Sequence, residues 1–177
     1  NQNKRTMQKI TRISIMENKN ITASVCMITY NHEHFIRKAI EGVLMQETDF
    51  PIELIIGEDC STDSTRKIVE EYAEKYPKLI RILLPEENLG MSENFIETMQ
   101  AARGKYIALC EGDDYWTDPY KLQKQVDFLE ANEEYILVTH GYSIISNNII
   151  VDVIDYKNHL DTDGQGFLFT SDFVLYN

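Results

Sequence analysis

Three acidic residues stand close together in the second half of the chain, and their spacing could hold a divalent cation. Glu111, Asp113 and Asp114 come shortly after the apolar residues Tyr106–Leu109. Acids this close repel one another and raise one another's pKa unless a cation or water lies among them. Carboxylate oxygens suit Mg²⁺ or Mn²⁺, and magnesium completes its coordination shell with water and substrate phosphates. The segment therefore predicts a cation that joins the protein to a diphosphate.

Most other acids near predicted strand ends have simpler structural explanations, with one exception. Asp118 precedes a proline, which predicts a helix cap. Ser61 is predicted to cap a second helix whose first turn carries Asp63. Asp59 ends a predicted strand with no helix to cap, so we expect it to bind a ligand. Its carboxylate could accept the N3–H of a uracil or thymine ring, beside which Tyr30 could pack.

Histidine and tryptophan residues near these acids are predicted to be structural. His32 and His34 lie two apart at the start of a predicted helix, so their side chains point to different faces and solvent or capping roles are expected. Trp116 is expected in the core. Residues 88–90 either form only a turn, with Gly90 supplying a positive φ, or contribute to a ligand site.

Apolar runs and helical stripes alternate along the chain. The runs predict strands at residues 23–29, 52–56, 79–84, 106–110 and 135–139. Apolar residues at helical spacing predict a helix after each of the first four strands. This alternation implies an α/β fold with a mainly parallel sheet and helices on both faces. Ligands of such sheets bind beyond the carboxyl ends of the strands, where the polar segments that follow the strands meet.

The charge is strongly acidic and unevenly distributed. The formal net charge is −12, which argues against binding a nucleic-acid backbone, because that depends on lysine and arginine. Residues 1–20 nevertheless form a basic tail, predicted to be a solvated arm or a contact with an anionic membrane surface. No apolar stretch approaches the ~20 residues of a membrane helix. We therefore predict a cytoplasmic protein, with the inner face of the membrane as the alternative.

A second acidic segment imitates a calcium loop. Residues 161–172 carry acids at the first, third and twelfth positions and glycine at the sixth. The preceding residues 149–154 are mostly β-branched, which disfavours the entering helix that such a loop needs. A polar turn is the simpler prediction. Because the chain begins at Asn1 and ends at Asn177 on an apolar run, we also expect it to be a fragment.

Four motifs in order give the chain a family resemblance. TYNHE, EDCSTDST, NLGMSENF and ARGKYIALCEGDDYW each follow or include a predicted strand end. Over about residues 22–140 the chain resembles the family 2 glycosyltransferases, which have the GT-A fold, a Rossmann-like arrangement, and are typically inverting. Each motif alone is weak, but the four in this order are specific.

The resemblance implies roles for individual residues. Asp113 matches the last acid of the family's Asp-x-Asp motif and is the expected ligand of Mn²⁺ or Mg²⁺, with Asp114 adjacent. Glu111 replaces the usual first Asp, and Cys60 and Glu93 stand where glycine and a basic residue are common. The positions that match nucleotide-binding residues of the family are Thr29, Tyr30, Glu33, Asp59, Asn88, Gly90 and Glu111.

The implied reaction moves a sugar from a nucleotide sugar to an acceptor hydroxyl with inversion. A UDP-sugar donor is favoured, and the acceptor would be a carbohydrate or lipid-linked molecule in polysaccharide or glycan biosynthesis. No acid after the metal motif matches the family's catalytic base, which we expect beyond Asn177. The predicted division is a basic tail (1–20), a nucleotide-sugar-binding GT-A domain (21–145) and the start of an acceptor-side region (146–177).

Two other functions stay open at this point. A nucleotidyltransferase could use a similar sheet and cation, but such enzymes usually carry a glycine-rich loop with a basic residue after the first strand. Residues 30–33 have neither feature. A non-catalytic domain that binds a nucleotide sugar or calcium is the second alternative.

Overall fold

The computed structural model describes residues 21–146, 149–154 and 173–176. Its helices are α2 (Ile36–Leu44), α3 (Thr65–Lys75), α4 (Met91–Gln100) and α5 (Lys121–Ala131). Its strands are β1 (Ala23–Thr29), β2 (Ile52–Glu58), β3 (Ile80–Leu83), β4 (Tyr106–Leu109), β5 (Leu137–Thr139), β6 (Tyr142–Ser146), β7 (Ile149–Ile154) and β8 (Phe173–Tyr176). The predicted strands and helices are all present, with ends shifted by a few residues.

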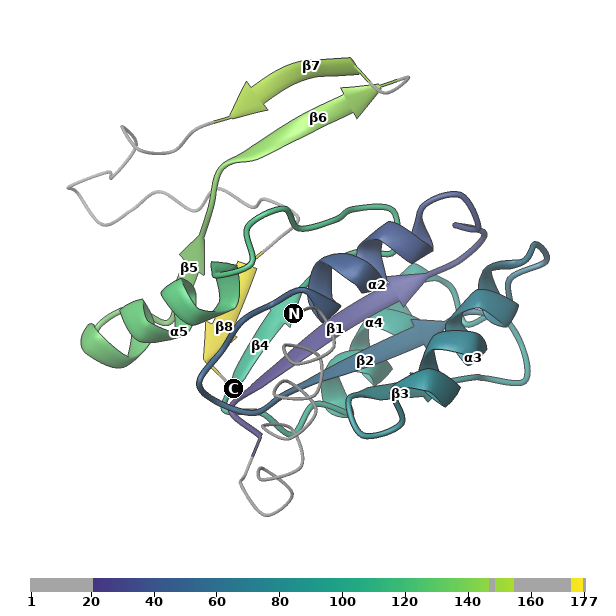
Figure 1. Cartoon of the computed structure of the whole chain (residues 1–177). Helices are drawn as coiled ribbons and strands as arrows, with labels where there is room; N and C mark the ends of the chain where they lie inside the picture. Colours follow the sequence, from purple (N-terminus) through teal and green to yellow (C-terminus); the bar gives the residue numbers. More distant parts are fainter. Residues whose placement is uncertain (1–20, 147–148, 155–172, 177) are drawn as a thin grey trace, which may run out of the picture.

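Within the described residues, six strands form one sheet in the order β3-β2-β1-β4-β8-β5 (Figure 1). The first four are parallel, and Ala23 of β1 is in register with Ile52 of β2 and Tyr106 of β4. β8 runs antiparallel to both of its neighbours, which the sequence analysis did not predict. The predicted α/β fold with a mainly parallel sheet is confirmed.

Helices cover both faces of this sheet. Val25 and Met27 of β1 share a core cluster with buried residues of α2, α3 and α5. Cys26 points to the opposite face, as alternation along a strand requires, and Phe95 and Met99 of α4 pack there. Burial raises the pKa of the Cys26 thiol to about 12, and the charge of a neighbouring glutamate adds to the effect. This cysteine therefore behaves as a small apolar core residue.

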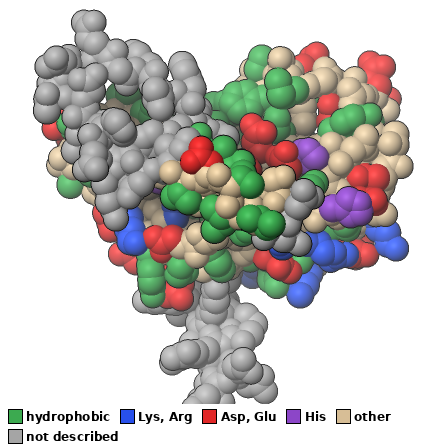
Figure 2. Space-filling view, turned by 90° about the horizontal axis from the view of Figure 1, so that it is seen from above, with side chains coloured by type: hydrophobic (Ala, Val, Ile, Leu, Met, Phe, Trp, Pro, Cys, Tyr) green, Lys and Arg blue, Asp and Glu red, His purple; other side chains and the backbone are tan. Residues whose placement is uncertain are grey.

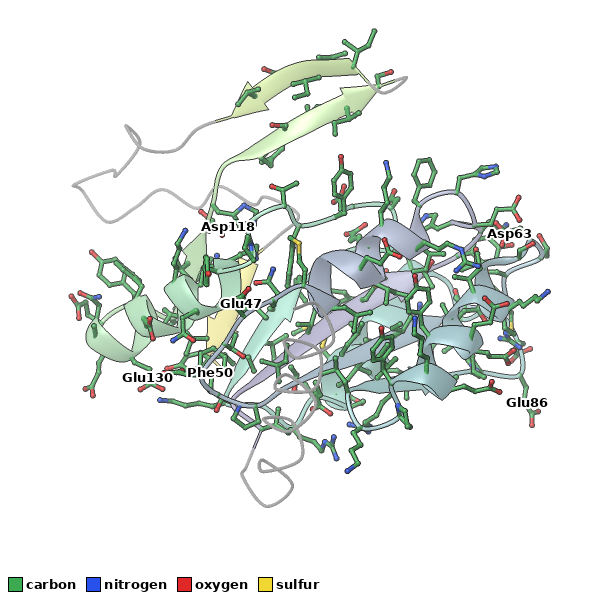
Figure 3. The ribbon with its side chains drawn as sticks, in the orientation of Figure 1. Glu47, Phe50, Asp63, Glu86, Asp118 and Glu130 are labelled. Carbon is green, nitrogen blue, oxygen red and sulfur yellow. The ribbon has the colours of Figure 1, made fainter. Side chains whose placement is uncertain are left out.

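The strand order reverses between β1 and β4. From β1 the chain builds outward through β2 and β3, and then crosses to the other side of β1 to form β4. Such a reversal opens a crevice beyond the carboxyl ends of the two strands, where α/β proteins bind their ligands. In Figure 3, Asp63 and Glu86, from the loops after β2 and β3, lie on one side of the ribbon, with Phe50 and Glu130 on the other.

A two-stranded hairpin projects away from the main sheet. β6 and β7 pair antiparallel, with an irregularity between Ile144 and Ile145. Figure 1 shows the hairpin beyond the segment that joins β4 to α5. Its exposed aliphatic side chains are Ile144, Ile145, Ile149, Ile150, Val151 and Val153.

Two predictions of the sequence analysis lie outside the described residues, namely the basic tail at 1–20 and the calcium-like segment 161–172. Among the helices that are described, none is long and apolar enough to cross a membrane.

Candidate active site at the carboxyl edge of the sheet

The loops after β1 and β2 interlock through hydrogen bonds. The Asn31 backbone N–H donates to Ser61 Oγ at 2.9 Å, and the Thr62 N–H donates to Asn31 Oδ1 at 2.8 Å. The Ser64 N–H donates to Glu33 Oε2 at 2.9 Å. Asn31 adopts a positive φ of 57°, which asparagine tolerates better than most residues. These bonds hold the first loop in one conformation beside β2.

Ser61 and Asp63 do not have the positions predicted for them at the start of a helix. α3 begins at Thr65, later than the sequence indicated, so Ser61 lies outside it and instead accepts the bond from the first loop. Asp63 accepts the Thr65 N–H at 2.9 Å and the Glu33 N–H at 3.1 Å. Burial raises the pKa of Asp63, but these hydrogen bonds outweigh burial and leave the pKa below its usual value. Asp63 thus joins the first loop to the start of α3.

Asp118 also lies farther from its helix than predicted. α5 begins at Lys121, and Asp118 Oδ1 accepts the Tyr120 N–H at 2.9 Å. Its other carboxylate oxygen accepts from Lys124 Nζ at 2.7 Å. The structural role predicted for Asp118 therefore holds, although the bond forms in the turn that leads into the helix.

Asp59 holds the loop after β3. Its side chain is only 2% exposed, and its two carboxylate oxygens accept the backbone N–H groups of Leu89 (2.7 Å) and Gly90 (2.9 Å). Asn88 Nδ2 donates to the Asp59 carbonyl at 2.8 Å. The expectation that Asp59 lacks a structural partner is wrong, although carboxylate lone pairs remain for a ligand N–H. The backbone of Gly90 has the predicted positive φ, at 81°.

The acidic segment after β4 packs directly against the end of β1. The Gly112 N–H donates to the Ile28 carbonyl at 3.0 Å, which continues the pairing of the two strands. A Cβ atom at Gly112 would lie 2.6 Å from Thr29 Oγ1 and 3.0 Å from His32 Nδ1. Only glycine therefore fits between the two acids Glu111 and Asp113. Thr29 Oγ1 and His32 Nδ1 are both buried and find no hydrogen-bond partner among the described residues.

His32 is brought to the acids, contrary to the role predicted for it. Its Nε2 lies 3.9 Å from Asp113 Oδ2, and its backbone N–H donates to Thr65 Oγ1 at 2.8 Å. The spacing argument failed because α2 begins only at Ile36, so His32 belongs to a loop and not to a helix face. His34 is largely exposed and lies next to Glu33. Figure 2 shows acidic and histidine side chains side by side on this face.

The electrostatics of the segment suit a cation. The pKa of the Glu111 carboxyl is raised, first because the surrounding protein removes part of its water and then because Asp113 and Asp114 lie near, although the side chain still reaches solvent. Within the described part of the chain, no three His, Cys, Asp or Glu side chains converge to enclose a metal ion. Magnesium needs only one or two protein carboxylates when a phosphorylated substrate supplies other ligands. Glu111 and Asp113 fit such an open donor set.

Two pockets meet at these acids from opposite faces of the sheet. The first, of about 330 Å³, is lined by Ile28, Met91, Ser92, Phe95, Ile96 and Glu111 and lies beside α4. The second, of about 520 Å³, is lined by His34, Phe35, Lys38, Asp113, Tyr115 and Ile145 and lies beside α2. Of the residues lining the pockets, the sequence analysis had singled out only Glu111, Asp113 and His34.

The predicted nucleotide residues form two neighbouring groups. Thr29 and Glu111 lie at the crevice between β1 and β4, while Asn88 and Gly90 surround Asp59. The Asp59 N–H donates to the Thr29 carbonyl at 3.1 Å, which joins the groups. Tyr30 is 44% exposed, so part of its side chain is open to solvent. The two groups therefore lie next to each other at the carboxyl edge of the sheet.

Comparison with known proteins identifies the family. The family model described as "Glycosyl transferase family 2" matches residues 24–167. The chain belongs to glycosyltransferase family 2. The match covers every element that carries the acidic segment and the loops around it, as well as the β6–β7 hairpin.

Curated relatives of this family 2 glycosyltransferase chain come from several bacteria. An uncharacterised Mycobacterium tuberculosis protein is 49% identical over 122 residues, which cover 69% of this chain and 35% of the relative. TuaG of Bacillus subtilis, named as a teichuronic acid biosynthesis glycosyltransferase, is 34% identical over 133 residues, or 75% of this chain and 51% of TuaG. The chain thus spans about a third to a half of these relatives.

Solved structures confirm the fold. TarS of S. aureus, in complex with UDP-GlcNAc, is 29% identical with a TM-score of 0.56 over 64% of this chain and 32% of TarS. A mannosyltransferase from Pyrobaculum calidifontis, in complex with GDP-Man and Mn²⁺, is 22% identical with a TM-score of 0.61, over 70% of this chain and 36% of that enzyme. The family 2 chain therefore has a GT-A-like fold.

Proposed function

We propose that this chain forms the donor-binding part of a metal-dependent, inverting glycosyltransferase. The observation that carries the proposal is the position of Glu111 and Asp113 at the crevice between β1 and β4, where the sheet order reverses. Among the described residues, no lysine or arginine forms a salt bridge with these two acids. Acids in this position would bind a cation, and the cation would bind a diphosphate. The reaction serves polysaccharide or glycan synthesis, as the name of the relative TuaG suggests.

The donor is a UDP-sugar in this proposal. Tyr30 directly follows β1 and Asp59 directly follows β2, and the last residues of these two strands are paired in the sheet. A carboxylate such as that of Asp59 suits the N3–H of uracil, because it accepts hydrogen bonds. The relative TarS, at 29% identity, is solved with UDP and with UDP-GlcNAc, which supports this donor class. Thr29, Glu33, Asn88 and Gly90 complete the nucleotide site.

Each side chain then has a defined task. Asp113, with Asp114 beside it, holds Mn²⁺ or Mg²⁺, and Glu111 contacts the ribose or the cation. When bound, the cation stabilises negative charge on the departing diphosphate. The acceptor oxygen bonds to the anomeric carbon as the bond to the diphosphate breaks, which inverts the configuration there. The proton of the acceptor hydroxyl passes to a carboxylate base, for which we assign no residue among those described.

Calorimetric titration with UDP, dTDP, GDP and ADP, each with and without Mn²⁺, tests the proposal. We expect the pyrimidine nucleotides to bind more tightly, and Mn²⁺ and UDP to tighten each other by the same factor, with a coupling of about 1 to 3 kcal/mol. Asp113→Asn should remove most of this coupling. Asp118→Asn is the matched control, because the Asp118 carboxylate accepts from Tyr120 and Lys124 in the turn before α5. Nucleotide binding that ignores the cation would exclude the proposed role of the acids.

A further inference from the structure

The second pocket is not explained by nucleotide binding. None of the predicted nucleotide residues lines it, although Asp113 forms one of its walls. Its volume of about 520 Å³ is within the range of small-molecule sites, roughly 300 to 1,000 Å³. It therefore has the size of a ligand site and touches the acidic segment, but it needs an occupant other than the nucleotide.

The positions of the two pockets point to a second substrate. The first pocket lies beside α4 on one face of the sheet and the second beside α2 on the opposite face. Glu111 lines the first and Asp113 the second, two residues apart on the same segment. A diphosphate held at this segment would leave its reacting end near both pockets. A molecule in the second pocket would then lie next to the bond that breaks.

The walls of the second pocket combine exposed rings with polar groups. Phe35 and Tyr115 are 52% and 38% exposed, and Ile145 of the hairpin adds an aliphatic wall. Lys38 Nζ lies 5.3 Å from the centroid of the Tyr115 ring, which holds the ammonium group at the pocket. Polar and apolar side chains therefore line this pocket together. Sites that orient small ligands place polar groups beside apolar walls in this way.

A pyranose ring matches these walls. Its C–H faces are apolar and pack on aromatic rings, while its hydroxyl groups need hydrogen-bond partners such as the Lys38 ammonium and the Asp113 carboxylate. We propose that the second pocket is the acceptor subsite and binds a pyranose unit of a carbohydrate acceptor against Phe35 and Tyr115. The inference rests on the proposed glycosyltransferase function and adds the place where its second substrate binds.

Protein-observed NMR tests this subsite. The whole chain with Mg²⁺ and UDP is titrated with methyl pyranosides of glucose, galactose, N-acetylglucosamine and glucuronic acid. We expect at least one glycoside to shift the amide signals of Phe35, Lys38 and Tyr115. Phe35→Ala should weaken that binding by about tenfold or more, because an aromatic anchor is lost. UDP affinity should stay at the parent value.

The matched control is Phe128→Ala, which removes another exposed ring, on α5 and away from the pocket. It should change glycoside affinity by less than about twofold. The subsite is excluded if UDP binds but no glycoside shifts these signals, or if Phe35→Ala binds glycosides as the parent does. If glycosides bind at the pocket but UDP binds nowhere, the carbohydrate site stands and the proposed donor function fails.

Discussion

Glu53, near the edge where the strands begin, is buried among hydrogen-bond donors, whereas Glu111, at the edge where they end, lies beside two further acids. Glu53 is 1% exposed and accepts from Ser24 Oγ at 2.7 Å, from Arg103 Nη2 at 2.5 Å and from Arg81 Nη1 at 3.1 Å. Burial raises the pKa of Glu53, but these donors outweigh burial and leave the pKa below its usual value.

The pKa of Glu111 changes in the opposite direction. Burial and the charges of Asp113 and Asp114 raise the pKa of its carboxyl, and only His32 acts in the other direction. Glu53 therefore stabilises the folded chain, whereas the charge on Glu111 lowers its stability. Proteins usually pair their charges, and exceptions are expected at functional sites. The contrast agrees with the proposal that Glu53 has a structural role and Glu111 a functional one.

The largest effect is expected from Glu53→Gln. The amide cannot satisfy the donors from Arg103 and Arg81 as the carboxylate does, so the free energy of unfolding should fall by about 2 to 4 kcal/mol. Urea unfolding at pH 7 measures it. Glu130→Gln is the control, because Glu130 pairs with Lys105 at the surface and should change stability by less than about 1 kcal/mol. Equal losses of unfolding free energy in both variants would show that Glu53 has no special structural role.

The same acid predicts a pH dependence. Because the pKa of Glu53 is lower in the folded chain than in the unfolded chain, its contribution is fully present above the unfolded value of about 4.3. It is lost as the pH falls through the folded value. The stability difference between parent and Glu53→Gln should therefore be constant near pH 7 and shrink below about pH 4. Unfolding midpoints measured from pH 7 to pH 3 test this, and a constant difference would contradict it.

Gly112→Ala should damage both the fold and the acidic segment. The added Cβ would lie 2.6 Å from Thr29 Oγ1, and Thr29 is buried in the end of β1. A forced fit of this kind costs about 1 to 3 kcal/mol of stability and would displace Glu111 and Asp113, so UDP binding should also weaken. The double variant Gly112→Ala/Thr29→Ala should recover part of the stability. Without recovery, the contact with Thr29 Oγ1 is not the main cause, because Thr29 Cβ, 2.7 Å from the added atom, remains in the double variant.

Asp59→Asn tests whether one acid can have both a structural and a ligand-binding role. Its carboxylate holds the N–H groups of Leu89 and Gly90, and one of these would face an amide NH₂ in the variant. We expect a loss of about 1 to 2 kcal/mol in unfolding free energy without nucleotide, and weaker UDP binding as well. Thermal unfolding and calorimetry separate the two effects. Unchanged stability with weaker UDP binding would make Asp59 purely a ligand residue.

The sequence predicted the elements and the position of the acids, because both depend on local patterns. Alternating apolar runs and helical stripes predict the α/β order, and the chain direction in a parallel sheet brings the polar loops to one edge. Contacts between distant segments have no such local signal. The pairing of β8 with β4, the bonds of Asp63 to the first loop, and the approach of His32 to Asp113 became known only from the structure.

Glu111→Gln is expected to have the smallest effect on stability, and the opposite sign. A carboxyl whose pKa is raised in the folded chain lowers stability at pH values above that pKa, so removing its charge should raise the unfolding free energy at pH 7. Because the side chain is solvent-accessible, the gain should be only a few tenths of a kcal/mol. Thermal unfolding of the cation-free chain measures it, with Glu130→Gln, which should shift slightly downward, as the control. The same substitution should weaken the coupling between Mn²⁺ and UDP, since one oxygen donor of the segment loses its charge. A variant that is less stable than the parent without any ligand would mean that Glu111 supports the fold, as Glu53 does, and the two edges of the sheet would no longer differ in kind.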